Sequence, residues 1–551
     1  MASSRLNPIY RSLLHGLVAA LAASASPAAA LPEGKLILED RIRQRLEAAI
    51  ESDSLEVLGE RLHAGALLQR AYSARGFRPF WVTARGVRPT GENFVRWLSE
   101  EPDKHGLSAS DYHLRAAREL HAAVDTPSLV DLELALSDAF LMLGSHLLAG
   151  RLNPESQDPE WRANRRHRDL LPVIERAAMT QQPGDALLEL LPRSADYEKL
   201  IRKLAELRNQ QSNGGWPPVP QGPTLREGDD DIRVAKLGER LRASGEFSGV
   251  PSTLFGTELA DAVRRFQSRH GLGTDGVVGQ ATLKALNVSV EARIDQIIVN
   301  LERWRWLPED LGERYILVNI AGFTLDVIEK ESALLSMRVV VGQPYRRTPV
   351  FSSVISYLVF NPSWEVPFSI AVKDKLPLIK GDPGYLARQG YTLLEGWGAS
   401  EKIIDPLTVD WATITAKNFP FRLRQSPGPH NALGRVKFMF PNEFAVYLHD
   451  TPSRELFVRE RRPFSSGCIR LQHPIELAEL LLAGNSSWNR AAIDRAISTG
   501  RETTVRLPHG VPVHLLYWTA WVDADDALQF RDDIYFRDTN VLRLLHAMPP
   551  D

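Results

Sequence analysis

The spacing of apolar residues changes part-way along this chain, and this change constrains the fold more than any other feature. From about Leu36 to Leu207 apolar residues recur at helical intervals. Leu136, Phe140 and Leu143, for example, fall on one face of a helix. Beyond about Arg314 the period is close to two, which is typical of strands. Since 551 residues hold several domains of ordinary size, we expect a multidomain α+β protein.

A linker and a small domain are predicted between these two parts. The linker contains Gly214-Gly215 and Pro217-Pro218, which break both helices and strands. The chain then returns to helical spacing and carries an Asp275-Gly276 turn. We therefore predict a helical domain over residues 31–208, a linker over 209–223 and a compact three-helix domain over 224–290.

The β-rich part is predicted to form a largely antiparallel domain over residues 300–520. Pro441-Asn442-Glu443 separates two strand-like runs and predicts a hairpin, with His449 where the second strand ends. The strand-like runs are Tyr315–Ile320, Met337–Val341, Val354–Phe360, Val436–Phe440 and Phe444–Leu448.

An insertion and a C-terminal strand pair complete the β-rich part. Residues 367–429 break the strand rhythm with helical and turn-like segments, which indicates an insertion. Pro474 to Leu482 predicts a helix with proline near its first turn. The last strand pair is predicted at Pro512–Val522 and Ala527–Tyr535, around an Asp-rich turn. Residues 521–551 are therefore assigned to a C-terminal strand and tail.

The N-terminus has the pattern of a signal peptide. Arg5 and Arg11 precede an apolar stretch from Leu13 to Ala23, and a small-residue cleavage site follows at Ala28-Ala29-Ala30. We predict cleavage after Ala30, which removes residues 1–30 on export. After this leader no stretch approaches the roughly 18 consecutive apolar residues of a membrane span. We expect no membrane span in the mature chain.

Cys468 is the only cysteine in the chain. In an oxidising compartment structural cysteines usually pair, so an odd one indicates a reactive thiol or an intermolecular link. A buried, inert cysteine is the alternative. His449 lies nineteen residues earlier, and an imidazole activates a thiol by taking its proton. The alternative for His449 is a strand-end histidine bonded to a backbone carbonyl.

Gly467 and Arg470 lie close to the cysteine and extend the candidate site. Gly467 allows a tight turn in which backbone N–H groups point at an oxyanion. Arg470 is suited to bind a substrate carboxylate or to hold the loop. Neither a metal nor a cofactor is predicted, because His430, His449 and His473 lack the spacing of a metal site. The formal net charge of -2 gives no electrostatic case for nucleic acid as a partner.

The histidine and the cysteine lie in two short runs, Leu448-His449-Asp450-Thr451-Pro452 and Ser465-Ser466-Gly467-Cys468-Ile469-Arg470. Together these runs resemble the signature of the L,D-transpeptidase catalytic domain of the YkuD type. The upstream run from Gly428 to Phe438 resembles the segment that leads into this histidine in large periplasmic members. The commoner family pattern has Gly and His where this chain has Asp450 and Ser466. The group that orients His449 is therefore open between Asp450, Ser466 and a backbone carbonyl.

Two further segments resemble companions of that domain. Residues 224–290, with Phe266 and Asp275-Gly276, look like the small three-helix peptidoglycan-binding domain. Residues 31–208, with the run from Gly150 to Pro154, are similar to the helical scaffold domain of large L,D-transpeptidases. The insertion over about 367–429 then corresponds to a lid over the active site.

The resemblance implies a periplasmic peptidoglycan L,D-transpeptidase. Cys468 would attack the tetrapeptide stem after diaminopimelate, release D-alanine and form a thioester, with His449 as base and then acid. The amides of Gly467 and Cys468 would bind the oxyanion. An amine of a second stem would then form a 3→3 cross-link. Implied partners are peptidoglycan stem peptides and glycan, with other cell-wall synthesis proteins. Substrate contacts are implied for Ser465, Ser466, Asn431, Tyr447 and Arg470.

Other functions remain open. With water as the acceptor the same chemistry is that of an L,D-carboxypeptidase, and with a lipoprotein lysine it anchors that lipoprotein to the wall. A non-catalytic peptidoglycan-binding protein would have no need of an intact His449 and Ser-Gly-Cys-Ile-Arg run. A cysteine endopeptidase of the wall normally carries its cysteine before its histidine, whereas His449 precedes Cys468 here. This order favours the transpeptidase.

Overall fold

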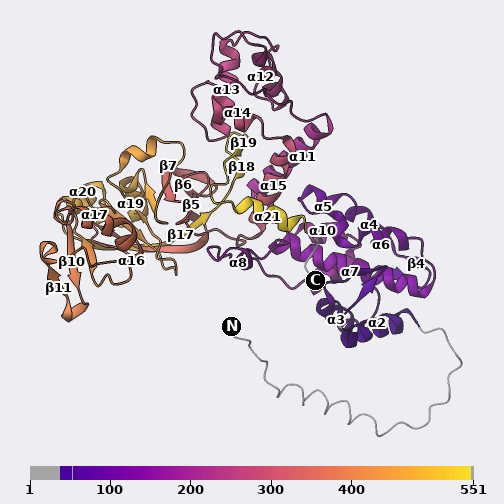
Figure 1. Cartoon of the computed structure of the whole chain (residues 1–551). Coiled ribbons are helices and arrows are strands. Elements are labelled where there is room, and N and C mark those ends of the chain that lie inside the picture. The colour runs from indigo at the N-terminus through magenta and orange to yellow at the C-terminus, as the bar shows by residue number, and fades with distance from the viewer. Residues whose placement is uncertain (1–36, 53, 548–551) are drawn as a thin grey trace, which may run out of the picture.

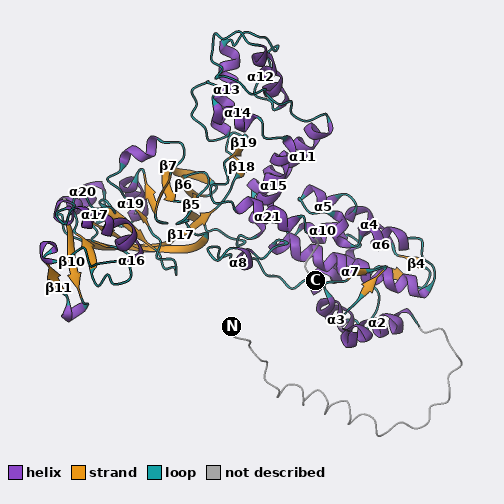
Figure 2. Ribbon diagram, viewed as in Figure 1, coloured by secondary structure: helices purple, strands orange, loops and turns teal. Residues whose placement is uncertain are grey.

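The chain folds into three lobes that meet at a common junction (Figure 1). The computed structural model describes residues 37–52 and 54–547, so the predicted signal peptide lies outside the described residues. Figure 2 shows that two of the lobes are helical and that the large sheet belongs to the third. The predicted multidomain α+β fold is confirmed.

The N-terminal lobe is built around one apolar helix, α7 (Thr126–Ala149). Its apolar residues surround the whole helix, and such a helix is stable when neighbours cover every face. Leu136 and Phe140 are fully buried. By length and composition α7 would suffice to cross a membrane, but most of it is buried inside this lobe. The other helices are α2 (Leu38–Ser52), α3 (Gly65–Ala74), α4 (Pro89–Leu98), α5 (Glu101–Lys104), α6 (Leu114–Leu120), α8 (Pro154–Gln157), α9 (Leu171–Thr180), α10 (Pro183–Leu188) and α11 (Ala195–Ser212).

Two short strand pairs in this lobe were not predicted. They are β1 (Glu56–Val57) with β2 (Glu60–Arg61), and β3 (Val82–Thr83) with β4 (Gly86–Val87). Each strand has only two residues, which is too short to show a sequence period.

The second helical lobe is the predicted three-helix domain. It contains α12 (Ile232–Ala243), α13 (Thr257–Arg269) and α14 (Gln280–Leu286) around a core that includes Leu237, Val263 and Phe266. The Asp231 side chain accepts a hydrogen bond from the Arg233 amide and so caps the start of α12. The three helices predicted from the sequence are confirmed. Helix α11 continues to Ser212, so the predicted linker is helical at its start.

A stem of two helices and two strands joins the three lobes. It consists of α11, α15 (Val290–Arg305), β18 (Ala520–Val522) and β19 (Leu528–Phe530), which share one hydrophobic core. Trp304 stacks on Trp518 in this core with ring centroids 4.5 Å apart. The sequence did not predict α15. Its last turns bury charged residues in ion pairs, Glu302 with Arg305 and Arg303 with Asp538, and these hide the apolar period.

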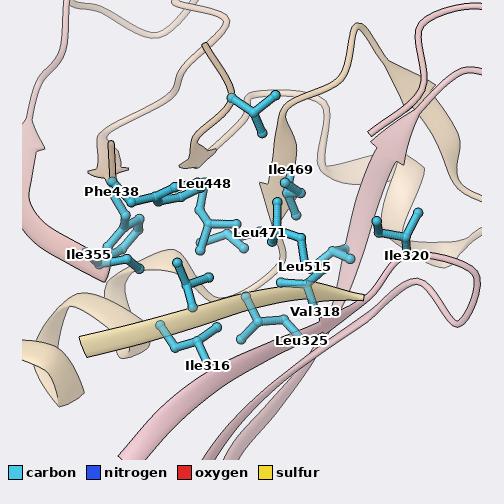
Figure 3. Packing of buried hydrophobic residues seen from close by; sticks show 14 of the residues in the cluster. Ile316, Val318, Ile320, Leu325, Ile355, Phe438, Leu448, Ile469, Leu471 and Leu515 are labelled. Carbon is cyan, nitrogen blue, oxygen red and sulfur yellow. The ribbon is translucent and has the colours of Figure 1, made fainter. Parts of the chain in front are cut away.

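The third lobe is a nine-stranded sheet in the order β15-β7-β16-β14-β13-β8-β17-β5-β6. Strand β6 also pairs with β7, so the sheet closes on itself. Most pairs are antiparallel, as predicted; the exceptions are β14–β16, β15–β7 and β17–β5. Figure 3 shows Ile316, Leu448 and Leu515 among the side chains packed in its core. The strands are β5 (Arg314–Asn319), β6 (Thr324–Glu329), β7 (Ser332–Gly342), β8 (Phe351–Phe360), β13 (Val436–Met439), β14 (Leu448–His449), β15 (Pro463–Ser465), β16 (Ile469–Leu471) and β17 (Thr503–Leu516).

The insertion predicted at residues 367–429 is a subdomain with its own sheet and core. Strand β9 (Trp364–Glu365) joins β10 (Tyr391–Glu395), β11 (Lys402–Ile404) and β12 (Arg422–Gln425) in the order β11-β10-β12-β9. Between β9 and β10 lie the helices α16 (Phe368–Ile370), α17 (Leu376–Gly381) and α18 (Tyr385–Arg388) and a π-helical turn, Ala371–Lys375. Ile379, Leu386 and Leu423 are fully buried in the insertion core.

Three predicted elements near the C-terminal end of the sheet need correction. The run Phe444–Leu448 forms a strand only at its end, because β14 begins at Leu448. The run Pro512–Val522 is divided between β17 and β18, and only β18 pairs with β19. The predicted tail contains a helix, α21 (Arg537–Leu545). Helix α19 (Pro474–Leu482) lies where it was predicted, and α20 (Arg490–Ser498) follows it.

Candidate active site

A cavity of about 490 Å³ lies between the large sheet and the insertion. The sheet and its loops contribute Cys468, His449 and Arg470, and the insertion contributes a wall from Pro367 to Lys375. Glu160, from the segment between α8 and α9, also lies on the rim. The predicted residues Ser465, Ser466 and Tyr447 line the same cavity. Six of the eight predicted site residues are thus brought together in one cleft.

Strand pairing aims the histidine and the cysteine at this cleft. Strands β14 and β16 are parallel, with Leu448 opposite Ile469 and His449 opposite Arg470. Leu448 and Ile469 point into the core (Figure 3). Since side chains alternate along a strand, His449 and Arg470 face the other way. Cys468 directly precedes β16, two residues before Arg470, and its side chain reaches the same cavity.

Hydrogen bonds fold the cysteine loop into a tight turn. The Ser465 hydroxyl donates to the Cys468 carbonyl over 2.5 Å and accepts from the Gly467 amide over 3.2 Å. The Thr348 hydroxyl donates to the Gly467 carbonyl over 2.8 Å. Gly467 has φ 117°, a conformation that side-chain-bearing residues rarely adopt. The turn therefore requires glycine at this position.

This turn changes the predicted oxyanion site. The Gly467 amide was expected to bind the oxyanion, but it already donates to the Ser465 hydroxyl. Among the hydrogen bonds of the described residues, none has the Cys468 amide as its donor. The Cys468 amide is therefore the better candidate for the oxyanion.

A backbone carbonyl orients the imidazole of His449. Its Nδ1 lies 2.5 Å from the Asp450 carbonyl oxygen, which can only accept, so Nδ1 carries the proton of the neutral ring. This leaves Nε2 as the proton acceptor. The Asp450 carboxylate instead accepts from the Arg435 amide over 2.9 Å and from Arg454 Nη1 over 3.1 Å. Of the three groups left open by the sequence, it is the backbone carbonyl of Asp450 that accepts the hydrogen bond from the imidazole.

Burial keeps both reactive groups neutral. It raises the pKa of the Cys468 thiol to about 11, although a hydrogen bond from the Tyr447 backbone, the Arg470 charge and a Tyr447 side-chain hydrogen bond each lower it. Burial, together with a smaller contribution from the Arg470 charge, lowers the pKa of His449 to about 3. At neutral pH the free chain therefore holds a thiol beside a neutral imidazole, and the imidazole has not yet taken the thiol proton. The proton must move as the thiol attacks its substrate.

Alkylation of the free chain tests this pairing of pKa values. With a thiol pKa of about 11, the thiolate fraction should rise about tenfold for each pH unit between pH 7 and pH 10. The rate of modification by iodoacetamide, followed by mass spectrometry, should rise in parallel. A plateau below pH 8 would instead mean that a thiolate–imidazolium pair already exists in the resting protein.

Arg470 is a half-buried guanidinium that lacks a carboxylate partner among the described residues. It lines the cleft, and its Nε has no hydrogen-bond partner. Burial lowers its pKa from the ordinary value for arginine, and the group remains positively charged at neutral pH. Burying an unpaired charge is costly, and an anionic group of a ligand in the cleft would compensate it.

Asn431 does not reach the cleft, which corrects its predicted role. Its side chain is 1% exposed and donates to the carbonyls of Pro362 and Ser426, both over 2.9 Å. It fixes the loop between the insertion and β13. An amide side chain that satisfies backbone carbonyls looks the same in sequence as one that binds a substrate.

The sequence missed an ion pair that closes one side of the cleft. Arg346, between β7 and β8, donates through both terminal nitrogens to the Asp374 carboxylate, with Nη2 2.8 Å from Oδ1. Its Nη1 also donates to the Ser466 hydroxyl over 2.9 Å. Asp374 lies in the π-helical turn of the insertion. This bidentate pair ties the insertion to the cysteine loop, and no local sequence pattern predicts it, because its partners lie 28 residues apart on different subdomains.

Three family models match the chain in succession. The model described as "Scaffold domain" matches residues 66–204, and the one described as "Putative peptidoglycan binding domain" matches 231–286. The model described as "L,D-transpeptidase catalytic domain" matches 313–503. The chain carries an L,D-transpeptidase catalytic domain. This transpeptidase domain contains the cleft residues Cys468 and His449 and the whole insertion.

Comparison with individual proteins agrees with the domain match. A curated protein of Haemophilus influenzae, named "Putative L,D-transpeptidase", is 36% identical over 254 residues, which are 46% of this chain and 50% of that relative. The chain thus spans about half the length of the curated relative that it matches.

Solved L,D-transpeptidase structures match with low identity. One from Xylanimonas cellulosilytica is 16% identical, with 54% of this chain and 100% of that chain covered and a TM-score of 0.17. One from Mycobacterium smegmatis is 14% identical, with 37% of this chain and 58% of that chain covered and a TM-score of 0.18.

Proposed function

We propose that this chain is an exported, cysteine-dependent peptidoglycan L,D-transpeptidase that works in the periplasm and makes 3→3 cross-links. One observation carries the proposal: Cys468 and His449 line a single cleft inside the domain that matches the transpeptidase family. The neighbouring peptidoglycan-binding domain match supports the wall as its substrate. The signal-peptide pattern supports export.

In the first half-reaction the thiol becomes a thioester. The Cys468 proton moves to His449 Nε2 while sulfur attacks the carbonyl carbon of diaminopimelate in a tetrapeptide stem. The Cys468 amide binds the oxygen of the tetrahedral intermediate. When this intermediate collapses, the bond to D-alanine breaks and His449 returns the proton to the leaving amine. Arg470 binds a carboxylate of the donor stem.

In the second half-reaction an amine takes the acyl group. The side-chain amine of a second stem attacks the thioester, His449 takes a proton from that amine, and the carbon–sulfur bond breaks. The Cys468 sulfur then regains a proton from His449. If water attacks instead, the product is a tripeptide and the protein acts as a carboxypeptidase. The insertion wall over the cleft supports the transferase because it limits the access of water.

Product analysis tests the proposal. The mature chain should convert purified disaccharide-tetrapeptide into a dimer that has lost one D-alanine, as measured by mass spectrometry. If tripeptide is the sole product, the protein is a carboxypeptidase and the proposed transferase activity is wrong. Unchanged substrate, from a folded chain, would favour a non-catalytic wall-binding role.

The Arg346–Asp374 pair should influence the choice between amine and water. A partly exposed ion pair stabilises the closed insertion by about 1 kcal/mol or less. Losing it therefore raises the ratio of open to closed insertion by about fivefold at most. We expect Asp374→Asn to raise the ratio of tripeptide to dimer by up to about that factor, because the insertion opens more often.

A second ion pair of the insertion provides the control. Asp382 pairs with Arg388 on its exposed surface, and neither residue lines the cleft. Asp382→Asn should leave the ratio of tripeptide to dimer unchanged. If both substitutions change the ratio equally, the tie through Arg346 has no special role.

A further inference from the structure

A second cavity, which we call the junction cavity, lies between the peptidoglycan-binding domain match and the transpeptidase domain. Its volume is about 280 Å³, close to the lower end of ordinary small-ligand sites, which is about 300 Å³. Ser268 near the end of α13 and Thr274 in the loop after it lie on one side. Phe323 and Arg462, which directly precede β6 and β15, lie on the other.

Specific contacts hold these two walls together. Arg269 Nε donates to the Leu528 carbonyl, and Arg531 Nη1 donates to the Arg269 carbonyl, each over 2.9 Å. The His270 ring stacks on Phe530 with centroids 5.6 Å apart. Strand β19 therefore fixes the end of α13 beside the sheet, and the cavity between them is built into the fold.

The lining of the junction cavity is positively charged. Four arginines and two carboxylates line it, Arg338, Arg461, Arg462 and Arg531 with Glu460 and Asp532. Arg462 and Arg531 donate only to backbone carbonyls and to the Gln529 amide oxygen. Burial lowers the pKa of both to about 10, so both stay charged at neutral pH. The excess positive charge suits a ligand with several carboxylates.

One short strand connects the junction cavity to the catalytic cleft. Arg462 precedes β15, and β15 ends at Ser465, which lines the cleft. At about 3.3 Å per residue, these ends lie about 10 Å apart along the strand. An extended peptide of three or four residues covers the same distance. One peptidoglycan strand is therefore long enough to occupy both cavities.

We propose that the junction cavity is a second binding site, which holds the stem-peptide carboxylates of a peptidoglycan strand while a donor stem of the same strand reaches Cys468. The choice of peptidoglycan as ligand rests on the proposed function. The peptidoglycan-binding domain match supplies one side of the site, and Arg338, Arg461 and Arg462 of the transpeptidase domain supply most of the charge. The site favours polymeric substrate over isolated fragments because a strand engages both cavities at once.

Strand binding tests this inference independently of catalysis. The probe is a set of purified glycan strands with tetrapeptide stems, and the protein is the mature Cys468→Ser chain. Arg338 and Arg461 pair with the lining carboxylates Glu460 and Asp532, so replacing both arginines by alanine leaves these carboxylates unpaired and removes the excess positive charge of the lining. We expect Arg338→Ala combined with Arg461→Ala to weaken binding about tenfold at low salt, and less at high salt. The same strands with amidated carboxylates should bind the chain with intact arginines about as weakly.

Arg193→Ala is the matched control, because Arg193 pairs with Glu309 over 3.6 Å at the surface, much as Arg461 pairs with Asp532 over 3.5 Å. It should not change strand binding. Two results would overturn the inference. One is that the double variant binds unmodified strands as tightly as the parent chain. The other is that the two substitutions weaken the binding of amidated strands as much as that of unmodified strands. If the Cys468 chain makes no product from disaccharide-tetrapeptide but strand binding still depends on the arginines, the proposed function fails and the binding site remains.

Discussion

Replacing Cys468 by alanine should abolish acyl transfer, lowering the rate of dimer formation from disaccharide-tetrapeptide by about 10⁴-fold or more. The thioester needs a sulfur at this position, and no other cysteine exists in the chain to replace it. The fold should survive, because a single sulfur atom beside a cavity contributes little packing. The measurement is product formation by mass spectrometry together with the Tm of each variant.

Cys468→Ser separates nucleophile strength from shape. The hydroxyl is far less nucleophilic than the thiolate, so this variant should also be inactive while it still binds substrate. Dimer formation by a folded Cys468→Ala variant at a rate near that of the parent chain would remove Cys468 from the mechanism. If the Cys468→Ala variant is inactive and its Tm is also much lower, the result shows only that Cys468 supports the fold.

Replacing His449 by glutamine should slow the formation of the acyl-enzyme by about 10³-fold, which lies within the usual range for a general base. The effect should be large because the thiol has a pKa of about 11 and cannot ionise alone at neutral pH. Intact-mass measurement of the acyl-enzyme follows this step directly, before any acceptor takes part.

Asp450→Asn is the informative companion variant. It removes the carboxylate but keeps the backbone carbonyl that accepts from His449 Nδ1. Acylation should therefore stay within about tenfold of the parent rate, whereas a triad built on that carboxylate would lose about 10⁴-fold. A loss as large as that of His449→Gln would transfer the orienting role to the carboxylate.

The sequence predicted those parts of the fold whose residues repeat with a clear period. The helices of the three-helix domain and the strands β5, β7, β8 and β13 lie where the apolar spacing predicted them. The strand expected at Phe444–Leu448 failed because Asn442 folds this run into a turn. Its side chain donates to the carbonyls of Phe440 and Val446 and accepts from the amides of Phe444 and Val446. Such side-chain bonds compete with strand pairing and leave the apolar pattern unchanged.

The candidate site was predicted to a similar extent and for a similar reason. His449 and Cys468 stand in short runs with local meaning, so the sequence located them. Arg346 and Asp374 meet only because the insertion folds back over the sheet, and the engaged amide of Gly467 depends on one hydroxyl rotamer of Ser465. Neither apolar spacing nor composition predicts contacts between distant segments or the acceptor that one backbone amide chooses.

The stem has a consequence for the order in which the molecule is assembled. Helix α11 is synthesised more than 300 residues before the strands β18 and β19 that complete its core. Until the last part of the chain has emerged, α11 and α15 lack two of their neighbours, and the lobe formed by α12, α13 and α14 has no fixed place beside the sheet. A chain that stops before Ala520 would keep every residue of the catalytic cleft and yet lose the alignment of its lobes.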